Sequence, residues 1–375
     1  MGDNTLKILI VAGARPNFMK IAPIIEVMEK YPAKIDYLLV HTGQHYDQKM
    51  SQSFFDALGL PTPDINLAVG SGSHAEQTAR IMLAFEPVCL QHQPDLVVVV
   101  GDVNSTMACT ITAKKLGIKV AHVEAGLRSR DMGMPEEINR LCTDVLCDYL
   151  FTNENLAAEG MPPEKIHFVG NVMIDTLLKH QARAKQLDTL KALNLQPGDY
   201  ATMTLHRPSN VDNKTVFEEI LKVFSEVTYR IPIVFPAHPR TLKMIHKYGL
   251  DSYFSQGSRV EGIWLTEPLG YLDFLNLNMH AKMVLTDSGG LQEETTALGV
   301  PCLTLRTNTE RPITCEIGTN VLVGNNPDRI REAAFGILDG DDRRSFLPEK
   351  WDGKAAKRIV DVLIQSFHST RQGGG

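Results

Sequence analysis

The chain has 375 residues, of which 43% are hydrophobic and 22% charged, and its formal net charge is −6. This near-average composition excludes a disordered or low-complexity chain, and the length predicts two domains. Without a basic stripe the negative charge disfavours a nucleic-acid partner, and no apolar run reaches the roughly 20 residues that span a bilayer.

The first half of the chain alternates short apolar runs with helical patterns. A nearly continuous apolar run over 6–12 predicts a strand buried on both faces. Phe18, Ile21, Ile25 and Met28 then recur at helical spacing and predict an amphipathic helix. Further strands are expected at 35–41, 95–100, 119–123, 149–151 and 166–169.

The second half repeats this rhythm, with strands expected at 201–205, 231–235, 262–265, 282–285 and 302–305. Strands that alternate with helices imply parallel sheets covered on both faces. The predicted fold class is therefore α/β, with two doubly wound Rossmann-like domains. We expect the first domain at 1–172, joined by a C-terminal helix at about 353–369, and the second at 173–352.

Six cysteines occur without a C-x-x-C pair, and all but Cys315 sit among apolar neighbours, so we expect reduced core residues. The histidines and carboxylates show no metal-ligand spacing, which predicts that no metal is bound. The first residues, Met1-Gly2-Asp3-Asn4-Thr5, lack the features of a secretory signal, so a cytoplasmic location is expected.

The strongest local motif, over 286–294, follows an apolar strand and opens a helix. Gly289 and Gly290 let a ligand approach the backbone, and free amides at a helix start attract a diphosphate. Ser288 can donate a further hydrogen bond, and Glu294 can accept from ribose hydroxyls. The alternative is an ordinary helix capped by Ser288.

No G-x-G-x-x-G follows the first strand, which disfavours a nicotinamide-dependent enzyme and predicts no cofactor. Arg15 and Lys20 flank the first helix start instead, where they could meet the charged end of a ligand. Taken singly, such a residue is more often a solvated surface charge.

Three carboxylates fall within 35 residues: Asp102, Glu124 and Glu136. Asp102 and Glu124 end successive predicted strands, so both should face one crevice at the carboxyl edge of the sheet. Paired carboxylates around a sugar ring stabilise an oxocarbenium ion and move protons. Any one of them could instead cap a helix, above all Glu136.

The second half adds polar groups at strand ends. His206 and His238 each close a predicted strand, and Arg311 follows the strand after the glycine motif. Histidines facing the same cleft as a diphosphate motif favour ligand contact over a purely structural role. An arginine suits bidentate phosphate recognition.

Taken together, the motifs resemble those of the non-hydrolysing UDP-N-acetylglucosamine 2-epimerase family. The markers are Gly13-Ala14-Arg15-Pro16 with Lys20, His41-Thr42-Gly43-Gln44-His45, Gly101-Asp102, His122-Val123-Glu124-Ala125-Gly126-Leu127-Arg128, Pro135-Glu136-Glu137-Ile138-Asn139-Arg140, Thr204-Leu205-His206-Arg207, Asp287-Ser288-Gly289-Gly290 and Glu310-Arg311-Pro312. The resemblance implies a glycosyltransferase-B-like fold with a UDP-binding second domain, an active site in the inter-domain cleft, and a homodimer. It also implies interconversion of UDP-GlcNAc and UDP-ManNAc for cell-surface polysaccharide.

The resemblance also implies roles for individual residues. The positions that match the family's catalytic residues are Asp102, Glu124, Glu136 and His206. The positions that match nucleotide-sugar contacts are Arg15, Lys20, His238, Phe274, Ser288, Gly289, Gly290, Glu294 and Arg311. Some relatives carry a second, activating site, which would involve Gln44 and Arg207. Pro208 and Ser209 depart from the family here, since many relatives have a second arginine directly after His-Arg.

The hydrogen at C2 of the sugar is not beside a carbonyl, so a carboxylate cannot remove it directly. Expelling UDP from C1 makes that hydrogen acidic, and anti elimination gives 2-acetamidoglucal, to which UDP adds back. Four alternatives stay open: an epimerase of a related 3-acetamido or uronic-acid UDP sugar, a hydrolysing 2-epimerase, a UDP-sugar glycosyltransferase, and a nucleotide-sugar sensor without activity.

Overall fold

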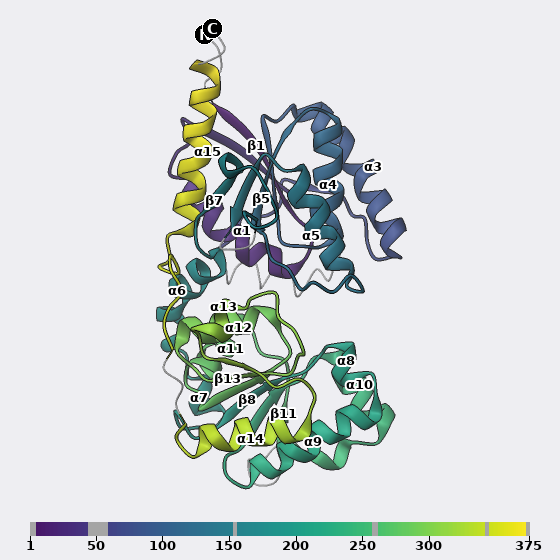
Figure 1. Ribbon diagram of the computed structural model, residues 1–375, viewed down its shortest axis with the longest axis vertical. Helices are drawn as coiled ribbons and strands as arrows, with labels where there is room; N and C mark the ends of the chain where they lie inside the picture. The colour runs from purple at the N-terminus through teal and green to yellow at the C-terminus, as the bar shows by residue number, and fades with distance from the viewer. Residues whose placement is uncertain (1–4, 44–58, 153–155, 257–261, 342–344, 373–375) are drawn as a thin grey trace. The chain divides into compact units, whose positions relative to one another are not determined.

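The computed structural model describes residues 5–43, 59–152, 156–256, 262–341 and 345–372, apart from the side chains of residues 15, 256 and 370–372. The chain forms two compact units (Figure 1). The first unit contains Met1–Thr176 and Glu349–Gly375, and the second contains Leu177–Pro348. The chain passes from the first to the second within helix α6 (Val172–Lys185).

The first unit is built on a seven-stranded parallel sheet with the order β3-β2-β1-β4-β5-β6-β7. Its strands are β1 (Leu6–Ala12), β2 (Ile35–His41), β3 (Ile65–Asn66), β4 (Leu96–Val100), β5 (Lys119–Ala125), β6 (Tyr149–Thr152) and β7 (Ile166–Phe168). The chain order reverses between β1 and β4. The carboxyl ends of these two strands therefore form the switch point where open α/β sheets bind ligands.

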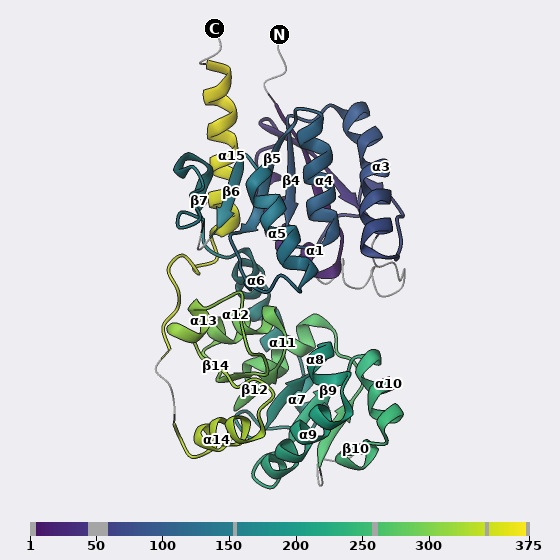
Figure 2. The same cartoon turned by 45° about the vertical axis from the view of Figure 1, so that its right-hand side comes forward.

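Helices cover both faces of this sheet. They are α1 (Arg15–Met28), α3 (His74–His92), α4 (Asn104–Lys115), α5 (Pro135–Leu146), the short 3₁₀ helix η1 (Pro163–Lys165) and α15 (Ala355–Gln372). Helices α3, α4 and α5 lie side by side on one face, whereas α1 and α15 lie together on the other (Figures 1 and 2). Alternate strand residues such as Leu9 and Val11 pack against Ile81 and Phe85 of α3.

The second unit repeats the architecture with the order β10-β11-β9-β8-β12-β13-β14, again entirely parallel. Its strands are β8 (Ala201–Thr204), β9 (Ile233–Pro236), β10 (Phe254–Gln256), β11 (Ile263–Thr266), β12 (Met283–Thr286), β13 (Cys302–Thr304) and β14 (Asn320–Leu322). The switch point of this sheet lies between the carboxyl ends of β8 and β12.

Its helices are α7 (Thr189–Ala192), α8 (Pro208–Val211), α9 (Lys214–Thr228), α10 (Pro239–Tyr248), the 3₁₀ helix η2 (Asp251–Tyr253), α11 (Tyr271–Met279), α12 (Gly289–Leu298), α13 (Ile313–Glu316) and α14 (Pro327–Leu338). Helix α9 begins where the Asn213 side chain accepts hydrogen bonds from the amides of Thr215 and Val216. Phe217, Ile220 and Phe224 then give it one buried face, which joins the core of this unit.

The predicted fold class is confirmed, since both units are α/β with parallel, doubly wound sheets. One strand limit bears on the placement of a candidate carboxylate, because β5 runs two residues past the predicted end at Val123 and so includes Glu124. Among the described residues, no helix is both long and apolar enough to cross a membrane.

The prediction for the cysteines is wrong at Cys142, which is exposed. Helix α5 buries the polar residues Asn139, Arg140 and Asp144 and turns Ile138, Cys142 and Val145 outward. Its apolar stripe therefore lies on the surface, so apolar neighbours in the sequence did not imply burial.

Candidate active site

The first switch point is shaped by a loop that replaces the glycine-rich turn of nucleotide-binding sheets. The Asn17 side-chain oxygen accepts hydrogen bonds from the amides of Gly13 (3.1 Å) and Ala14 (2.9 Å), and its nitrogen donates to the carbonyl of Val100 (3.2 Å). A Cβ at Gly13 would come within 2.3 Å of the Ser105 hydroxyl oxygen. The ends of β1 and β4 are thus joined closely, which requires a glycine at this position.

Glu124 lies near the end of β5 in a backbone conformation that side chains rarely adopt, with φ at +71°. The pairing of β5 with β6 shifts register between Val123 and Ala125, so a bulge accommodates this residue. Its carboxylate forms an ion pair with the ammonium group of Lys20, and the two side chains are only 7% and 9% exposed. A buried pair of this kind is stable only while both partners remain.

Gly101 makes room for this ion pair. A Cβ at Gly101, whose φ is +69°, would lie 3.3 Å from Lys20 Nζ and 3.6 Å from Glu124 Oε2. The next residue is Asp102, so the two predicted carboxylates lie at the carboxyl ends of adjoining strands and share one edge of the sheet. The structure therefore brings Lys20, Asp102 and Glu124 to the same edge.

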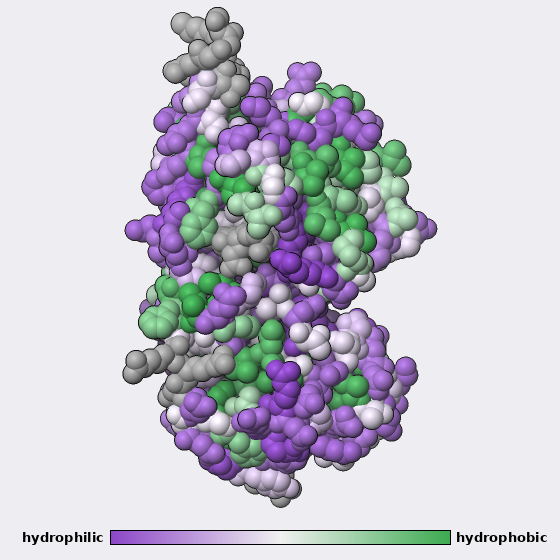
Figure 3. Space-filling model, in the orientation of Figure 1, coloured by the Kyte–Doolittle hydropathy of each residue, from purple (hydrophilic) through white to green (hydrophobic). Residues whose placement is uncertain are grey.

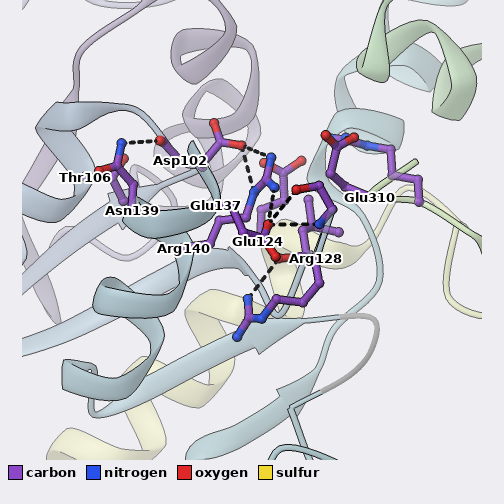
Figure 4. Close-up of polar contacts among 12 residues, drawn as sticks. Asp102, Thr106, Glu124, Arg128, Glu137, Asn139, Arg140 and Glu310 are labelled. Carbon is purple, nitrogen blue, oxygen red and sulfur yellow. Dashed lines mark hydrogen bonds and ion pairs between the residues drawn. The ribbon is translucent and has the colours of Figure 1, made fainter. Parts of the chain in front are cut away.

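Asp102 is held by Arg140 of α5 (Figure 4). Nε and one terminal nitrogen of Arg140 donate to the same carboxylate oxygen of Asp102, at 3.0 and 2.6 Å. The other terminal nitrogen of Arg140 donates to Glu137 at 2.8 Å. The side chain of Asp102 is 29% exposed, so this fixed carboxylate is accessible at the carboxyl edge of the sheet.

Glu137 holds the second terminal nitrogen of the Arg140 guanidinium group. Burial alone would raise the pKa of Glu137, but hydrogen bonds from the amides of Ser129 and Arg130 and from Arg140 lower it below its ordinary value. Its neighbour Glu136 is half-buried in the first turn of α5, where the helix dipole favours a carboxylate. The two adjacent glutamates therefore have different environments, and Glu137 has a structural role.

Two of the predicted site residues cannot be placed. Gln44 lies outside the described residues, and so does the side chain of Arg15.

The second switch point holds an Asp–His pair. The Asp287 carboxylate, which is fully buried, lies 2.9 Å from Nδ1 of His206 and accepts hydrogen bonds from the amides of His206 and Arg207 and from Asn210. Burial would raise the pKa of Asp287, but His206 and these amides lower it. The imidazole is 49% exposed, so its Nδ1 is fixed by a carboxylate while its other edge faces outward.

Helix α12 begins at Gly289, as the motif predicts. Ser288 occupies the N-cap position, but its side chain accepts no hydrogen bond from the described amides of the helix. A Cβ at Gly289 would lie 3.0 Å from a terminal nitrogen of Arg311, whose Nε lies 2.8 Å from a Glu293 oxygen. The amides of the helix start and a guanidinium group therefore adjoin, a combination that suits a diphosphate.

Glu294 is buried one turn into α12. Burial and the neighbouring Glu293 raise the pKa of Glu294 to about 8. Glu293 pairs with Arg311, so the two adjacent carboxylates have different environments. A carboxyl group with such a shift is a candidate for ligand contact.

The remaining predicted residues have contacts that position them. Nδ1 of His238 accepts the amide of Arg240 at the start of α10, and burial, His206 and Arg240 lower the pKa of His238. Phe274 is half-buried on α11 and packs against an apolar core. Nε of Arg207 donates to the carbonyl of Asp287 at 3.0 Å.

Several contributors were not among the predicted site residues, notably Asn17, Arg140 and Asp287. Each lies inside or directly beside a quoted motif, so the motifs could have drawn attention to these residues. The sequence did not indicate which side chain each of them contacts. Within the part of the chain that the structure describes, no group of three or more His, Cys, Asp or Glu side chains could hold a metal ion.

Comparison with known proteins gives consistent findings. Residues 28–364 match the family model described as UDP-N-acetylglucosamine 2-epimerase. The chain is 42% identical to the UDP-N-acetylglucosamine 2-epimerase of Methanocaldococcus jannaschii over 96% of this chain and 99% of that protein. A crystal structure of the enzyme from that organism, in complex with UDP-GlcNAc and UDP, superposes with a TM-score of 0.85 over 96% of this chain and 99% of that one, at 42% identity. The UDP-2,3-diacetamido-2,3-dideoxy-D-glucuronate 2-epimerase of Pseudomonas aeruginosa is 38% identical over 96% of this chain and 100% of that protein.

Proposed function

The chain belongs to the UDP-N-acetylglucosamine 2-epimerase family, and from this premise we propose that it interconverts UDP-GlcNAc and UDP-ManNAc. The observation that carries the proposal is the pair of cation-bound carboxylates at adjoining strand ends, Glu124 with Lys20 and Asp102 with Arg140. Ion pairing holds both carboxylates in a fixed geometry, as proton transfer at a sugar carbon requires. The sugar product would serve cell-surface polysaccharide.

The proposed reaction breaks the bond between C1 and the diphosphate oxygen, and the electron pair leaves with UDP. A carboxylate removes the C2 proton, which gives 2-acetamidoglucal. A proton then adds to C2 from the opposite face while UDP returns to C1. The first unit would supply the groups that act on the sugar, from among Asp102, Glu124 and Glu136. The reaction as a whole consumes no water.

The second unit would hold the departing UDP. Amides of Gly289 and Gly290, the Ser288 hydroxyl and Arg311 would bind the diphosphate, whose charge grows as the bond breaks. His206, with Nδ1 fixed by Asp287, would donate a proton or hydrogen bond from Nε2. In the first unit, Arg15 and Lys20 would add positive charge for the charged end of the nucleotide sugar. Glu294 would accept from the ribose hydroxyls, with His238 and Phe274 near the nucleotide.

A second candidate function is epimerisation of a UDP-2,3-diacetamido uronate. The 38% identity to a relative with that name, over nearly the whole chain, favours it. The two substrates differ at C3 and C6, whereas the proposed chemistry at C1 and C2 is the same.

The deciding experiment offers each nucleotide sugar separately in deuterated water and follows proton NMR. We expect UDP-ManNAc to form from UDP-GlcNAc, with deuterium at C2 and no free N-acetylmannosamine. Free sugar with UDP would identify a hydrolysing enzyme instead. Turnover of the diacetamido uronate alone would establish the second candidate. If neither sugar gained deuterium at C2, both candidates would be refuted.

We also propose that the protein is a homodimer through an apolar surface on α3 and α5, defined by Leu83, Leu90, Ile138, Cys142 and Val145. Figure 3 shows hydrophobic side chains gathered over α3, α4 and α5. Val145 is 62% exposed, although the opposite side of its helix is buried and charged. A helix with an apolar exposed side and a polar buried side favours a partner that has the same apolar face.

Light scattering with size exclusion tests this assembly. The wild type should have twice the chain mass, and Val145→Glu should shift it to a monomer. Tyr229→Glu is the control, because Tyr229 is 89% exposed in the second unit and should leave the dimer intact. A monomeric wild type would contradict the assembly.

A further inference from the structure

A buried histidine–aspartate pair lies next to the strand ends that carry the two cation-bound carboxylates. His122 of β5 and Asp144 of α5 have side chains that are 1% and 0% exposed. Nδ1 of His122 lies 2.6 Å from Asp144 Oδ1, and its Nε2 lies 2.8 Å from the carbonyl oxygen of Gly101. The imidazole therefore bridges α5 to the end of β4.

Both of these oxygens act as acceptors. A carbonyl oxygen can only accept, and His122 and Arg128 lower the pKa of Asp144 although burial alone would raise it. Both ring nitrogens of His122 therefore face oxygen atoms, a geometry that fits an N–H group on each nitrogen. Asp144 contacts this ring, and Arg128 pairs with both Asp144 and Glu159.

The second oxygen of Asp144 holds the other strand end. It accepts the amide of Gly126 at 3.1 Å and a terminal nitrogen of Arg128 at 2.7 Å. Gly126 lies two residues after Glu124, and Gly101 lies immediately before Asp102; all three of Gly101, Glu124 and Gly126 have positive φ. One buried pair thus fastens both irregular backbone segments that present the carboxylates.

We propose that His122 and Asp144 are positioning residues for the reaction, which hold the Asp102 and Glu124 carboxylates in register through the backbone at Gly101 and Gly126. The inference rests on the proposed function, since it assigns the pair to the acid–base groups of that reaction. Neither residue touches the substrate. Their effect is on the geometry of proton transfer and not on nucleotide binding.

A purely structural role is the competing explanation, and the kinetic constants distinguish the two. A buried ion pair adds little net stability compared with apolar residues of similar volume, whereas it can define one conformation. Small displacements of reacting groups, of about 1 Å, can lower a rate by roughly 100-fold. We therefore expect kcat to respond strongly while nucleotide affinity in the second unit does not.

The kinetic test compares Asp144→Asn and His122→Gln with a control at Asp148, between α5 and β6. Asp148 accepts the amide of Val120 and pairs with Lys114, both at 2.8 Å, at the opposite end of β5. We expect kcat to fall by about 100-fold in the two test variants, with KM and the UDP dissociation constant within about threefold of wild type. Asp148→Asn should keep kcat within about twofold. Equal losses in test and control variants, or an unchanged kcat in Asp144→Asn, would overturn the inference.

A second measurement needs neither a variant nor turnover. Nitrogen-15 NMR of the full-length wild type, labelled at histidine, should show a ring at His122 with two slowly exchanging N–H groups at neutral pH. A single N–H at His122 would overturn the inference even if the enzyme is active. Conversely, a wild type that does not epimerise either sugar but shows both N–H groups would overturn the proposed function and leave the bridging geometry intact.

Discussion

Replacing Glu294 with Gln should stabilise the second unit at pH 8 and have little effect near pH 4.5. In the folded protein the pKa of Glu294 is raised from 4.5 to about 8 by burial and by Glu293. Between these values the folded state keeps a proton that the unfolded state has released, so stability is lost as the pH rises through this window. One pKa unit corresponds to about 1.4 kcal/mol, which sets an upper bound on the order of 4 kcal/mol at pH 8.

The assay is thermal unfolding of wild type and Glu294→Gln between pH 4.5 and 8.5. For a unit of this size that bound corresponds to roughly 10 °C in melting temperature at pH 8. Glu332→Gln is the control, because Glu332 is an exposed glutamate of α14 in the same unit. A melting difference that is independent of pH, or that grows toward acid, would refute the assignment of a neutral buried carboxyl group.

The same carboxyl group should couple UDP binding to proton release. Accepting two ribose hydroxyls favours the ionised form, so binding should expel up to one proton at pH 7 in the wild type and none in Glu294→Gln. Calorimetric titrations with UDP in two buffers of different ionisation enthalpy measure this directly. Identical proton release in both proteins would remove Glu294 from the nucleotide site.

Three further substitutions test the remaining site residues. Glu124→Gln should lower kcat by at least about 100-fold, the range for a positioned acid or base, and near-normal turnover would exclude it from proton transfer. Asp287→Asn replaces an acceptor facing Nδ1 of His206 by an amide, so kcat should fall by about 10-fold or more and the acidic limb of the pH–rate profile should move; an unmoved profile would contradict the pairing. Gly289→Ala places a Cβ 3.0 Å from Arg311 and should weaken UDP binding by about 10-fold in calorimetry, while folding stability changes by no more than about 1 kcal/mol. Unchanged UDP affinity would show that this helix start does not contact the nucleotide.

Local patterns predicted the central strands of both sheets and the placement of the carboxylates, but not β3, β10 and β14, which are edge strands of only two or three residues and show no long apolar run. Apolar runs over 6–12 and 95–100 correspond to β1 and β4, and the residues after them lie at the carboxyl edge, as parallel topology requires. The rule that ligands meet strand ends therefore located Asp102 and Glu124 without any knowledge of tertiary structure.

Long-range partners were beyond reach because sequence spacing does not encode them. Arg140 lies 38 residues from Asp102 and is joined to it only because α5 packs at the end of β4. The bulge at Glu124 depends on how β5 pairs with β6 and has no local signature. The burial predicted for Cys142 was wrong because the apolar stripe of α5 faces outward and its buried stripe is polar.

The most direct test of the proposed elimination of UDP follows the oxygen atom that joins the sugar to the nucleotide. UDP-GlcNAc labelled with oxygen-18 in the C1–O–phosphorus bridge is incubated with the protein, and recovered substrate is examined by phosphorus-31 NMR. If UDP leaves and returns, the label scrambles into the non-bridging positions of the β-phosphate during epimerisation. A label that stays in the bridge while C2 inverts would show that the bond never breaks.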